Sequence, residues 1–257
     1  FLQLFSYFYI SNDLIQLYMR IQEIIQKNRR PFIIAEMSGN HNQSIDRALA
    51  IIDAAAEAGA DAIKLQTYTA DTMTLKGVEK IEDRNSLWYG YELHDLYKQA
   101  YTPWEWHQAL LDRAKEHGMI AFSSPFDATS VDFLESLNMP IYKIASFENT
   151  DIPLIKKIAQ LGKPVIMSTG VATLGEIDEA VRVLMENGCP ELVLLKCTST
   201  YPASPETTNL ATIPHIKQIF NCTVGLSDHT MGIGAAVGAV ALGAEVIEKH
   251  FTLSRAD

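Results

Sequence analysis

Two short apolar segments near the end of the chain each carry a histidine at their end. His229 lies in TVGLSDHT (223–230), and His250 lies in VIEKHF (246–251). The small-residue segment between them has about the length that a β-α-β crossover needs. Histidines at the same ends of neighbouring parallel strands can share one divalent metal ion. For either histidine alone an ordinary strand-end position is the favoured interpretation, so the metal site depends on the pair and on the other strands.

The rest of the chain alternates strand-like and helical patterns. Short apolar or β-branched runs predict strands at 32–37, 62–67, 119–125, 141–146, 164–169, 192–198, 223–228 and 246–251. Helical segments between them begin at Ser44, Pro103 and Thr173, which are typical first-turn or N-cap residues. Eight strands alternating with helices predict a (β/α)₈ TIM barrel, ahead of an open doubly wound sheet. No G-x-G-x-x-G motif follows the first strand, which disfavours a dinucleotide-binding fold.

The active site of a TIM barrel lies at the carboxyl ends of its strands, so the side chains there indicate the chemistry. In this chain those ends carry Glu36, Lys64, Gln66, Ser124, Lys143, Ser146, Glu148, Ser199, Tyr201, Ser227, His229, Glu248 and His250. Buried charges without partners are costly, so a ring of them needs a reason. A structural ion pair is the alternative for any single lysine, and Lys196 and Lys249 have the further alternative of pointing outward.

The collection of side chains has a coherent chemical character. Two lysines with several hydroxyls suit a phosphate and a carboxylate. Two histidines suit Mn²⁺, Zn²⁺ or a similar ion that acts as a Lewis acid on a carbonyl group. Glu36 and Glu148 are candidates for proton transfer or for binding sugar hydroxyls. An anionic phosphorylated substrate that meets a polarised carbonyl is the chemistry indicated.

Several motifs resemble those of the sialic acid synthase family. They are IAEMSGNHNQS, AGADAIKLQTYTADTMTL, FSSPFD, YKIASFE, LLKCTSTYP, GLSDHT and ALGAEVIEKHF, which together extend over about residues 32–255. The resemblance implies a TIM-barrel transferase that condenses phosphoenolpyruvate with an open-chain amino-sugar aldehyde and releases phosphate. It also implies a homodimer in the full-length protein and a C-terminal antifreeze-like domain. Nothing in this chain corresponds to that domain, so we expect a barrel truncated after its eighth strand.

The resemblance also assigns roles by position. His229 and His250 match the ligands of a divalent metal ion, with Mn²⁺ expected first and Co²⁺, Mg²⁺ or Zn²⁺ as alternatives. Glu36 matches a catalytic carboxylate that manages protons and water. The positions that match phosphoenolpyruvate-binding residues are Lys64, Ser124, Lys143, Ser146, Ser199 and Ser227. Those that match sugar-binding residues are Gln66, Glu148 and Tyr201.

Within the family, the segments SLW, LYKQAYTPWEWH, FSSPFD and KCTSTYP resemble the pseudaminic branch most. That branch uses a 2,4-diacetamido-2,4,6-trideoxy-hexose, and legionaminic and sialic acid synthases are the alternatives. Ser199 stands where the sialic acid branch has an asparagine. A contact to phosphoenolpyruvate from Ser199 would be shorter or mediated by water.

Two other functions remain open at this level. A Schiff-base aldolase on the same fold would use Lys143 or Lys196 as nucleophile, but it leaves both histidines unexplained. A non-catalytic barrel would act as a sensor or an assembly subunit. The full set of polar residues at the strand ends argues against this second alternative.

Composition limits the partners and the compartment. The 257 residues carry a net charge of −10, which argues against nucleic acid or an anionic membrane as the main partner. Three widely spaced cysteines indicate neither a disulfide framework nor a zinc motif, and Cys197 is expected to be a buried thiol. No apolar run is long enough to span a bilayer. A cytoplasmic protein is the expectation.

Domain organisation follows from the same patterns. Residues 1–30 are expected to form an N-terminal extension, of which 1–18 precede the natural start at Met19, and residues 31–257 are expected to form the barrel. About 35 residues, 68–102, separate the second strand from its helix, which is far more than a usual βα loop. The aromatic residues of this segment, among them Trp88, Tyr97 and Tyr101, favour an ordered lid or wall.

Overall fold

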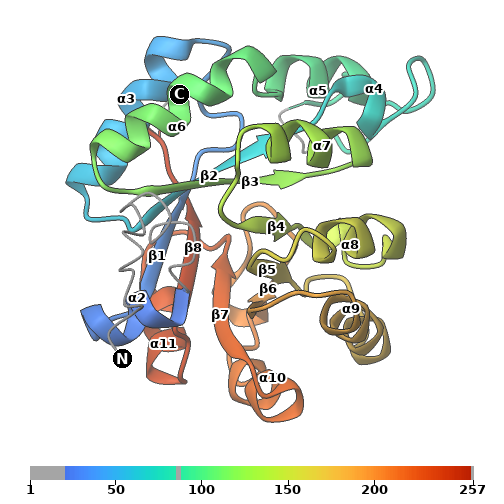
Figure 1. The fold of residues 1–257 in the computed structure, drawn as a ribbon. Coiled ribbons are helices and arrows are strands. Elements are labelled where there is room, and N and C mark those ends of the chain that lie inside the picture. The colour runs from blue at the N-terminus through green and yellow to red at the C-terminus, as the bar shows by residue number, and fades with distance from the viewer. Residues whose placement is uncertain (1–20, 85–87, 256–257) are drawn as a thin grey trace, which may run out of the picture.

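The computed structural model describes residues 21–84 and 88–255. Within these residues, eight parallel strands close into a barrel in which each strand lies beside its neighbour in sequence and β8 pairs with β1 (Figure 1). The strands are β1 (Phe32–Glu36), β2 (Ala62–Thr67), β3 (Ile120–Pro125), β4 (Tyr142–Ile144), β5 (Val165–Ser168), β6 (Leu192–Cys197), β7 (Thr223–Asp228) and β8 (Val246–His250). The predicted TIM barrel is therefore confirmed.

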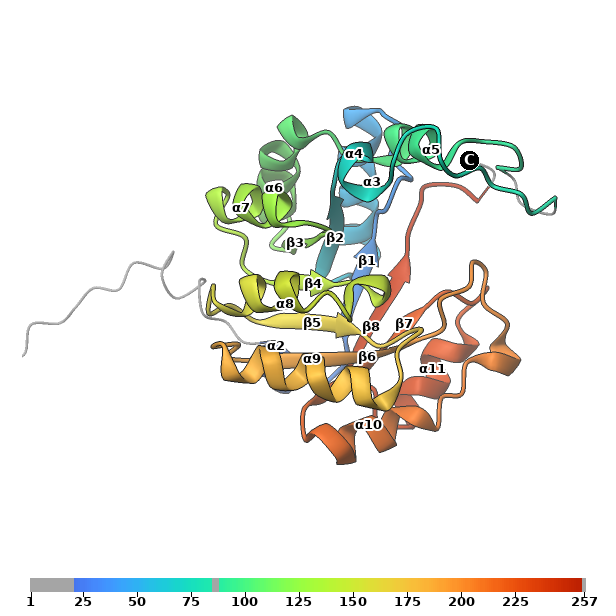
Figure 2. The same ribbon diagram turned by 90° about the vertical axis from the view of Figure 1, so that its right-hand side faces the viewer.

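Helices surround the barrel (Figures 1 and 2). They are α2 (Ile21–Asn28), α3 (Ile45–Glu57), α4 (Ala70–Met73), α5 (Leu93–Ala100), α6 (His107–Glu116), α7 (Ala128–Ser136), α8 (Ile152–Ala159), α9 (Leu174–Glu186), α10 (Thr212–Phe220) and α11 (Gly234–Ala241). Short 3₁₀ helices are η1 (Trp104–Trp106), η2 (Ser146–Glu148) and η3 (Pro205–Thr207). No helix of the described residues is long and apolar enough to cross a membrane.

Predicted helix starts agree with the observed caps. The Ser44 side chain accepts a hydrogen bond from the backbone N–H of Arg47 at the start of α3. Thr173 and Glu176 form a capping box at the start of α9. Both arrangements satisfy backbone donors that a helix leaves without a partner in its first turn.

Two elements are shorter than their sequence patterns suggest. The fourth strand was expected over 141–146 but covers only Tyr142–Ile144, because the chain turns into η2 at Ser146. The small-residue segment 231–245 contains a helix of only eight residues, α11. Gly232 and Gly243 have positive φ values on either side of α11, a conformation that glycine adopts without steric cost and that does not continue a helix.

The segment after β2 forms a wall of its own. It contains α4 and α5, and the Tyr68 ring lies edge-on to the rings of Tyr97 and Phe126 at centroid distances of 5.7 and 5.4 Å. The aromatic residues Trp88, Tyr89 and Tyr91 are exposed. Helices α4 and α5 of this segment lie beside the ends of the strands (Figure 1).

The N-terminal end of the barrel is closed by α2. Ile21 is buried in the main hydrophobic core, and the Glu191 carboxylate accepts hydrogen bonds from the backbone N–H groups of Ile21 and Gln22. Residues 21–28 of the expected N-terminal extension therefore pack as part of the barrel. The expectation about residues 1–18 and Met19 lies outside the described residues.

Apolar packing fills the barrel beneath the strand ends. Strand alternation places Ile34, Phe122 and Leu195 below the polar ends, and all three are fully buried. Gly225 allows β7 and β8 to approach here, because a Cβ atom at this position would lie 2.1 Å from the Val246 carbonyl oxygen and 2.7 Å from Leu195 Cδ2. This apolar floor supports the polar groups above it.

Candidate active site

A polar cavity lies at the carboxyl ends of the strands. Its lining consists of Glu36, Lys64, Gln66, Lys143, Ala145, Ser146, Ser168, Cys197, Tyr201, Ser227, His229, Glu248 and His250. Nine of the twelve residues predicted from the sequence belong to this lining. The other three, Ser124, Glu148 and Ser199, lie outside it.

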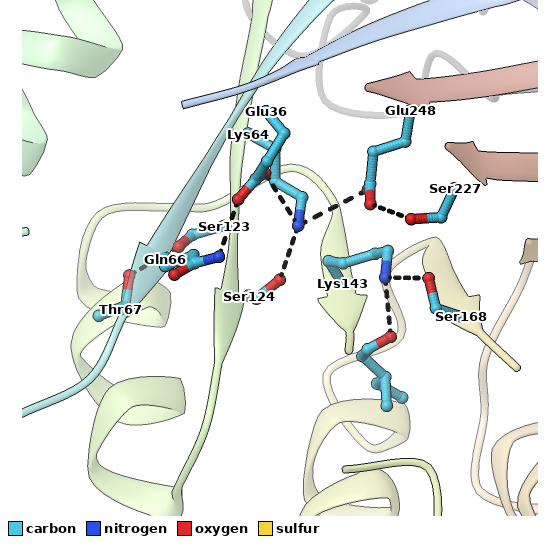
Figure 3. Close-up of polar contacts among 11 residues, drawn as sticks. Glu36, Lys64, Gln66, Thr67, Ser123, Ser124, Lys143, Ser168, Ser227 and Glu248 are labelled. Carbon is cyan, nitrogen blue, oxygen red and sulfur yellow. Dashed lines mark hydrogen bonds and ion pairs between the residues drawn. The ribbon is translucent and has the colours of Figure 1, made fainter. Parts of the chain in front are cut away.

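Lys64 lies between two carboxylates in the centre of the cavity (Figure 3). Its Nζ is 2.9 Å from Glu36 Oε2 and 3.6 Å from Glu248 Oε2, and all three residues are buried. Burial by itself lowers the pKa of Lys64, but Glu248 and Glu36 raise it above its ordinary value, so the lysine stays charged. Ser124 stands behind this group, with its Oγ 3.5 Å from Lys64 Nζ.

Glu36 is positioned from two sides. The Gln66 amide donates to Glu36 Oε1 at 2.9 Å, while Lys64 holds the other oxygen. Burial raises the pKa of Glu36 against the opposing effect of Lys64. A carboxyl group whose pKa is raised toward neutrality is suited to accept and return a proton.

Glu248 has the opposite character. It accepts a hydrogen bond from Ser227 Oγ at 2.9 Å (Figure 3). Burial opposes its ionisation, but the nearby Lys143 and Lys64 outweigh burial and lower its pKa to about 2. The site therefore contains two carboxyl groups whose pKa values are shifted in opposite directions. From the sequence, Glu248 has a position at a strand end but no assigned role. Glu248 shares the inward face of β8 with His250, which is the pattern that could have identified it.

Lys143 is a buried cation without a carboxylate in contact. Its Nζ donates to Ser168 Oγ at 2.6 Å and to the Ile144 carbonyl oxygen at 3.0 Å (Figure 3). It forms no ion pair with another residue of the described chain. Burial lowers its pKa. A buried lysine satisfied only by neutral oxygens forms a natural binding position for an anionic ligand.

Ser146 and Ser199 meet at Gly170. A Cβ atom at Gly170 would lie 2.2 Å from Ser199 Oγ and 2.8 Å from Ser146 Oγ, so only glycine fits between them. Ser146 lines the cavity, whereas Ser199 is half-buried outside the lining, with its Oγ 3.7 Å from Cys197 Sγ. The contact of Ser199 to phosphoenolpyruvate, direct or mediated by water, stays a prediction.

Glu148 lies beside the cavity on η2. Its Oε2 atom is buried and has no hydrogen-bond partner among the described residues. Burial raises its pKa to about 7, against the effect of Lys143. A polar atom left without a partner in this position is available to a ligand group.

The two histidines lie close together at the rim. Their ring centroids are 5.4 Å apart, and the Tyr201 ring lies 4.2 Å from that of His229 and 5.8 Å from that of His250. His229 Nδ1 is 2.9 Å from the carbonyl oxygen of Thr198. Because a carbonyl oxygen only accepts, this nitrogen carries the proton, and in the neutral ring Nε2 keeps its lone pair. Burial lowers the pKa of His229, but Cys197 and the Thr198 carbonyl outweigh burial and raise it.

These features fit a divalent metal ion. A histidine ligand commonly donates its second ring N–H to a carbonyl oxygen, as His229 does. His250 keeps some exposed surface, yet the surrounding protein and the nearby His229 and Lys64 lower its pKa to about 4, which keeps the imidazole neutral. Imidazole nitrogens bind Zn²⁺ at about 2.1 Å, so rings at this separation are within range of one shared ion. No cluster of three histidine, cysteine or carboxylate ligands occurs in the described part of the chain.

Cys197 is a member of the site that the sequence analysis missed. It is buried in β6 as expected, but its Sγ lines the cavity 3.8 Å from His229 Nδ1. Burial by itself raises the pKa of the thiol, yet His229, Ser146 and Ser199 outweigh burial and lower it to about 7. Strand alternation places Cys197 and Leu195 on the inward face of β6, and this pattern in the sequence is enough to predict that Cys197 faces the cavity.

Lys196 is turned away from the cavity. Its Nζ donates to Thr198 Oγ1 at 2.6 Å, and its neighbour Cys197 occupies the inward position on β6. The expectation that Lys196 could serve as a Schiff-base nucleophile is therefore wrong, because successive side chains of a strand point to opposite faces. Lys143 is the one of those two lysines that reaches the cavity.

Comparison with known proteins places this geometry in a family. The chain matches the NeuB family over residues 51–257. It is 48% identical to a pseudaminic acid synthase of Campylobacter jejuni subsp. jejuni over 229 residues, which cover 89% of this chain and 67% of that protein. It is 40% identical to an N,N'-diacetyllegionaminic acid synthase of the same organism over 230 residues, 88% of this chain and 69% of that protein.

A solved structure gives the same result. The crystal structure of an N-acetylneuraminic acid synthetase from Leptospira borgpetersenii serovar Hardjo-bovis, in complex with citrate, superimposes with a TM-score of 0.79 at 35% identity. The similarity covers 89% of this chain and 75% of that one. The chain spans about two thirds of the length of the curated relatives it matches.

Proposed function

This chain belongs to the NeuB family, and on that premise we propose that it condenses phosphoenolpyruvate with an open-chain 2,4-diacetamido-2,4,6-trideoxy-hexose aldehyde. Water is the third reactant, and the products are pseudaminic acid and phosphate. The observation that carries the proposal is Lys143, a buried cation that no described carboxylate contacts, beside a second buried lysine, Lys64. A ligand with a carboxylate and a phosphate would complete both positions.

The reaction forms one carbon–carbon bond, and it replaces the carbon–oxygen bond to phosphate with one to the oxygen of water. C3 of phosphoenolpyruvate attacks the aldehyde carbon, water adds to C2, and phosphate leaves with the bridging oxygen. Lys64 and Lys143 would hold the anionic groups and stabilise the charge that builds up on the phosphate. Glu36 would accept the proton of the attacking water, because Gln66 and Lys64 hold its carboxylate in the cavity.

The sugar would bind at the side of the cavity near η2 and Tyr201. Glu148 offers a buried oxygen without a partner, and Tyr201 lies against both histidines. Gln66 would contribute an amide to sugar hydroxyls as well as to Glu36.

His229 and His250 would hold a divalent ion, for which we propose Mn²⁺, with Co²⁺, Zn²⁺ or Mg²⁺ as alternatives. The support is the separation of their rings and the bond between Nδ1 of His229 and the Thr198 carbonyl. When bound, such an ion would supply Lewis-acid polarisation of the aldehyde carbonyl. Substrate and water would complete its coordination.

The pseudaminic branch is proposed from two observations. Identity to the pseudaminic acid synthase is 48%, against 40% to the legionaminic acid synthase of the same organism. Ser199 also stands where the sialic acid branch has an asparagine. The legionaminic and sialic acid reactions are the alternatives. A homodimer in the full-length protein and a cytoplasmic location both stay predictions.

Phosphate release from phosphoenolpyruvate tests this proposal. The assay would use this protein at the full length of its relatives, with Mn²⁺ and a panel of amino sugars, and His250→Ala as control. We expect release that depends on the metal and occurs with the 2,4-diacetamido-2,4,6-trideoxy-altrose substrate. Release with N-acetylmannosamine alone would keep the family and contradict the branch. Absence of release with every sugar would contradict the synthase, and pyruvate trapped on Lys143 by borohydride would identify an aldolase instead.

A further inference from the structure

An ion pair on the outer face of the barrel connects the two strands that carry the histidines. Asp228 and Lys249 are register partners on β7 and β8, which lie side by side in Figure 1. Lys249 Nζ donates to Asp228 Oδ2 at 2.7 Å. Each of these residues directly precedes one histidine, Asp228 before His229 and Lys249 before His250. The pair therefore links the two strands at the point where the histidines leave them.

Thr230 extends the ion pair into a closed network. Asp228 Oδ1 accepts from the backbone N–H of Thr230 at 2.9 Å and from its Oγ1 at 2.7 Å. Lys249 Nζ donates its other bond to the Thr230 carbonyl oxygen at 2.7 Å. The backbone on both sides of His229 is thus held by side chains, and the His229 carbonyl accepts a further bond from the backbone N–H of Ala203 at 2.9 Å.

We propose that Asp228, Thr230 and Lys249 are positioning residues that set the separation of His229 and His250 and thereby the affinity of the pair for a divalent ion. The inference rests on the proposed two-histidine site. None of the three residues lines the cavity. Strand alternation points Asp228 and Lys249 outward, whereas their neighbours Ser227 and Glu248 point into the cavity. They act through the backbone that carries the histidines.

The energetics favour positioning over simple stabilisation. The side chain of Asp228 is fully buried and that of Lys249 is 30% exposed. Burying such a pair costs desolvation free energy, and an apolar pair of similar size often stabilises a fold equally well. An apolar pair would not hold Thr230 by three separate bonds, two of which go to its backbone. A metal site tolerates errors of only about 0.2 Å in its ligand distances, so it benefits from a rigid connection.

The test measures Mn²⁺ binding directly, by calorimetry, with neither phosphoenolpyruvate nor sugar present. Lys249→Met removes the charge and keeps the length of the side chain. We expect the dissociation constant for Mn²⁺ to rise about tenfold, which is the lower end of the effect of residues that orient metal ligands. Thr230→Val removes one bond of the network and should give a smaller rise in the same direction.

Lys163→Met is the matched control. Lys163 forms an ion pair with Glu135 at 2.8 Å, and its side chain is 20% exposed, which is similar to Lys249. It precedes β5 at the opposite end of the barrel. This variant should lose a similar amount of thermal stability and leave Mn²⁺ affinity unchanged. Affinity for phosphoenolpyruvate alone should be unchanged in Lys249→Met.

The outcomes separate this inference from the proposed function. Unchanged Mn²⁺ affinity in both Lys249→Met and Thr230→Val would overturn the positioning role, provided that His229→Ala weakens binding. Equal binding by wild type and His229→Ala would instead show that the two-histidine site is wrong, and the inference would fall with it. If Lys249→Met does not fold, Thr230→Val and Lys249→Arg decide, since the arginine keeps the charge and should restore affinity.

Discussion

Lys143 illustrates at the residue scale how function conflicts with stability. It is fully buried in β4, and its ammonium group is bound only by the Ser168 hydroxyl and the Ile144 carbonyl. Desolvation of an ammonium group costs several kcal/mol, and two neutral acceptors offset only part of this. A residue with such an arrangement stabilises the complex with an anion more than it stabilises the free protein.

We therefore predict different effects of Lys143→Met on the free and the bound protein. The melting temperature without ligand should change little, because the apolar side chain needs no hydration but the attraction between Lys143 and Glu248 is lost. The increase in melting temperature caused by phosphoenolpyruvate should disappear. In wild type, a ligand concentration 100 times the dissociation constant should raise the free energy of unfolding by about 2.7 kcal/mol.

Thermal unfolding with and without phosphoenolpyruvate checks this prediction. Lys157→Met is the control, because Lys157 forms an exposed ion pair with Asp132 outside the cavity. That variant should keep the full ligand-induced increase. A normal increase in Lys143→Met would refute the anion-binding role of this lysine.

At the scale of elements, a buried chain of hydrogen bonds connects α6 to β2 and β3. Thr67 Oγ1 lies 2.8 Å from His107 Nε2 and 2.7 Å from Ser123 Oγ, and all three residues are buried. His107 Nδ1 lies 3.3 Å from the Pro103 carbonyl, so this nitrogen carries the proton and Nε2 accepts from Thr67. These hydrogen bonds fix strand β2, which carries Lys64 and Gln66, against helix α6.

Thr67→Val should therefore destabilise the protein more than its small change in shape suggests. It leaves His107 and Ser123 without a partner, at a cost of about 1–3 kcal/mol for each buried group. Urea unfolding measures the loss. Thr67→Ser keeps the hydroxyl and should retain most of the stability, so equal losses in the two variants would contradict this explanation.

Buried histidines affect the stability of the whole molecule. His41 and His107 are fully buried, and burial lowers the pKa of each to about 4. Between pH 6.5 and about 4 the unfolded chain binds a proton at each position and the folded chain does not. The free energy of unfolding contributed by these groups therefore falls as the pH decreases through this window, and it is fully retained above pH 6.5.

A pH series of urea unfolding for wild type and His107→Gln isolates this effect, since contributions of the other groups cancel in the difference. The advantage of wild type over the variant should shrink by about 1.4 kcal/mol for each pH unit between 6.5 and 4. His41→Gln should behave in the same way. A difference that does not change with pH would show that His107 is protonated in the folded state.

Local patterns in the sequence predicted the barrel well. Each strand carries its own apolar run, each βα unit connects to the next with one handedness, and the carboxyl ends of parallel strands meet at one face. These rules need no knowledge of distant contacts. They were sufficient to place Glu36, Lys64, Lys143, Ser227 and the two histidines in one cavity.

The tertiary structure decided which of these residues touch. Glu248 pairs with Lys64 across the barrel, Cys197 lies against His229, and Ser199 packs against Gly170 outside the cavity lining. These contacts depend on the stagger of the strands and on side-chain conformations, which link residues far apart in the chain. Hydrophobic periodicity carries no information about either. The sequence by itself therefore determined most members of the site, and only the closed barrel decided how they pair and in which direction their pKa values shift.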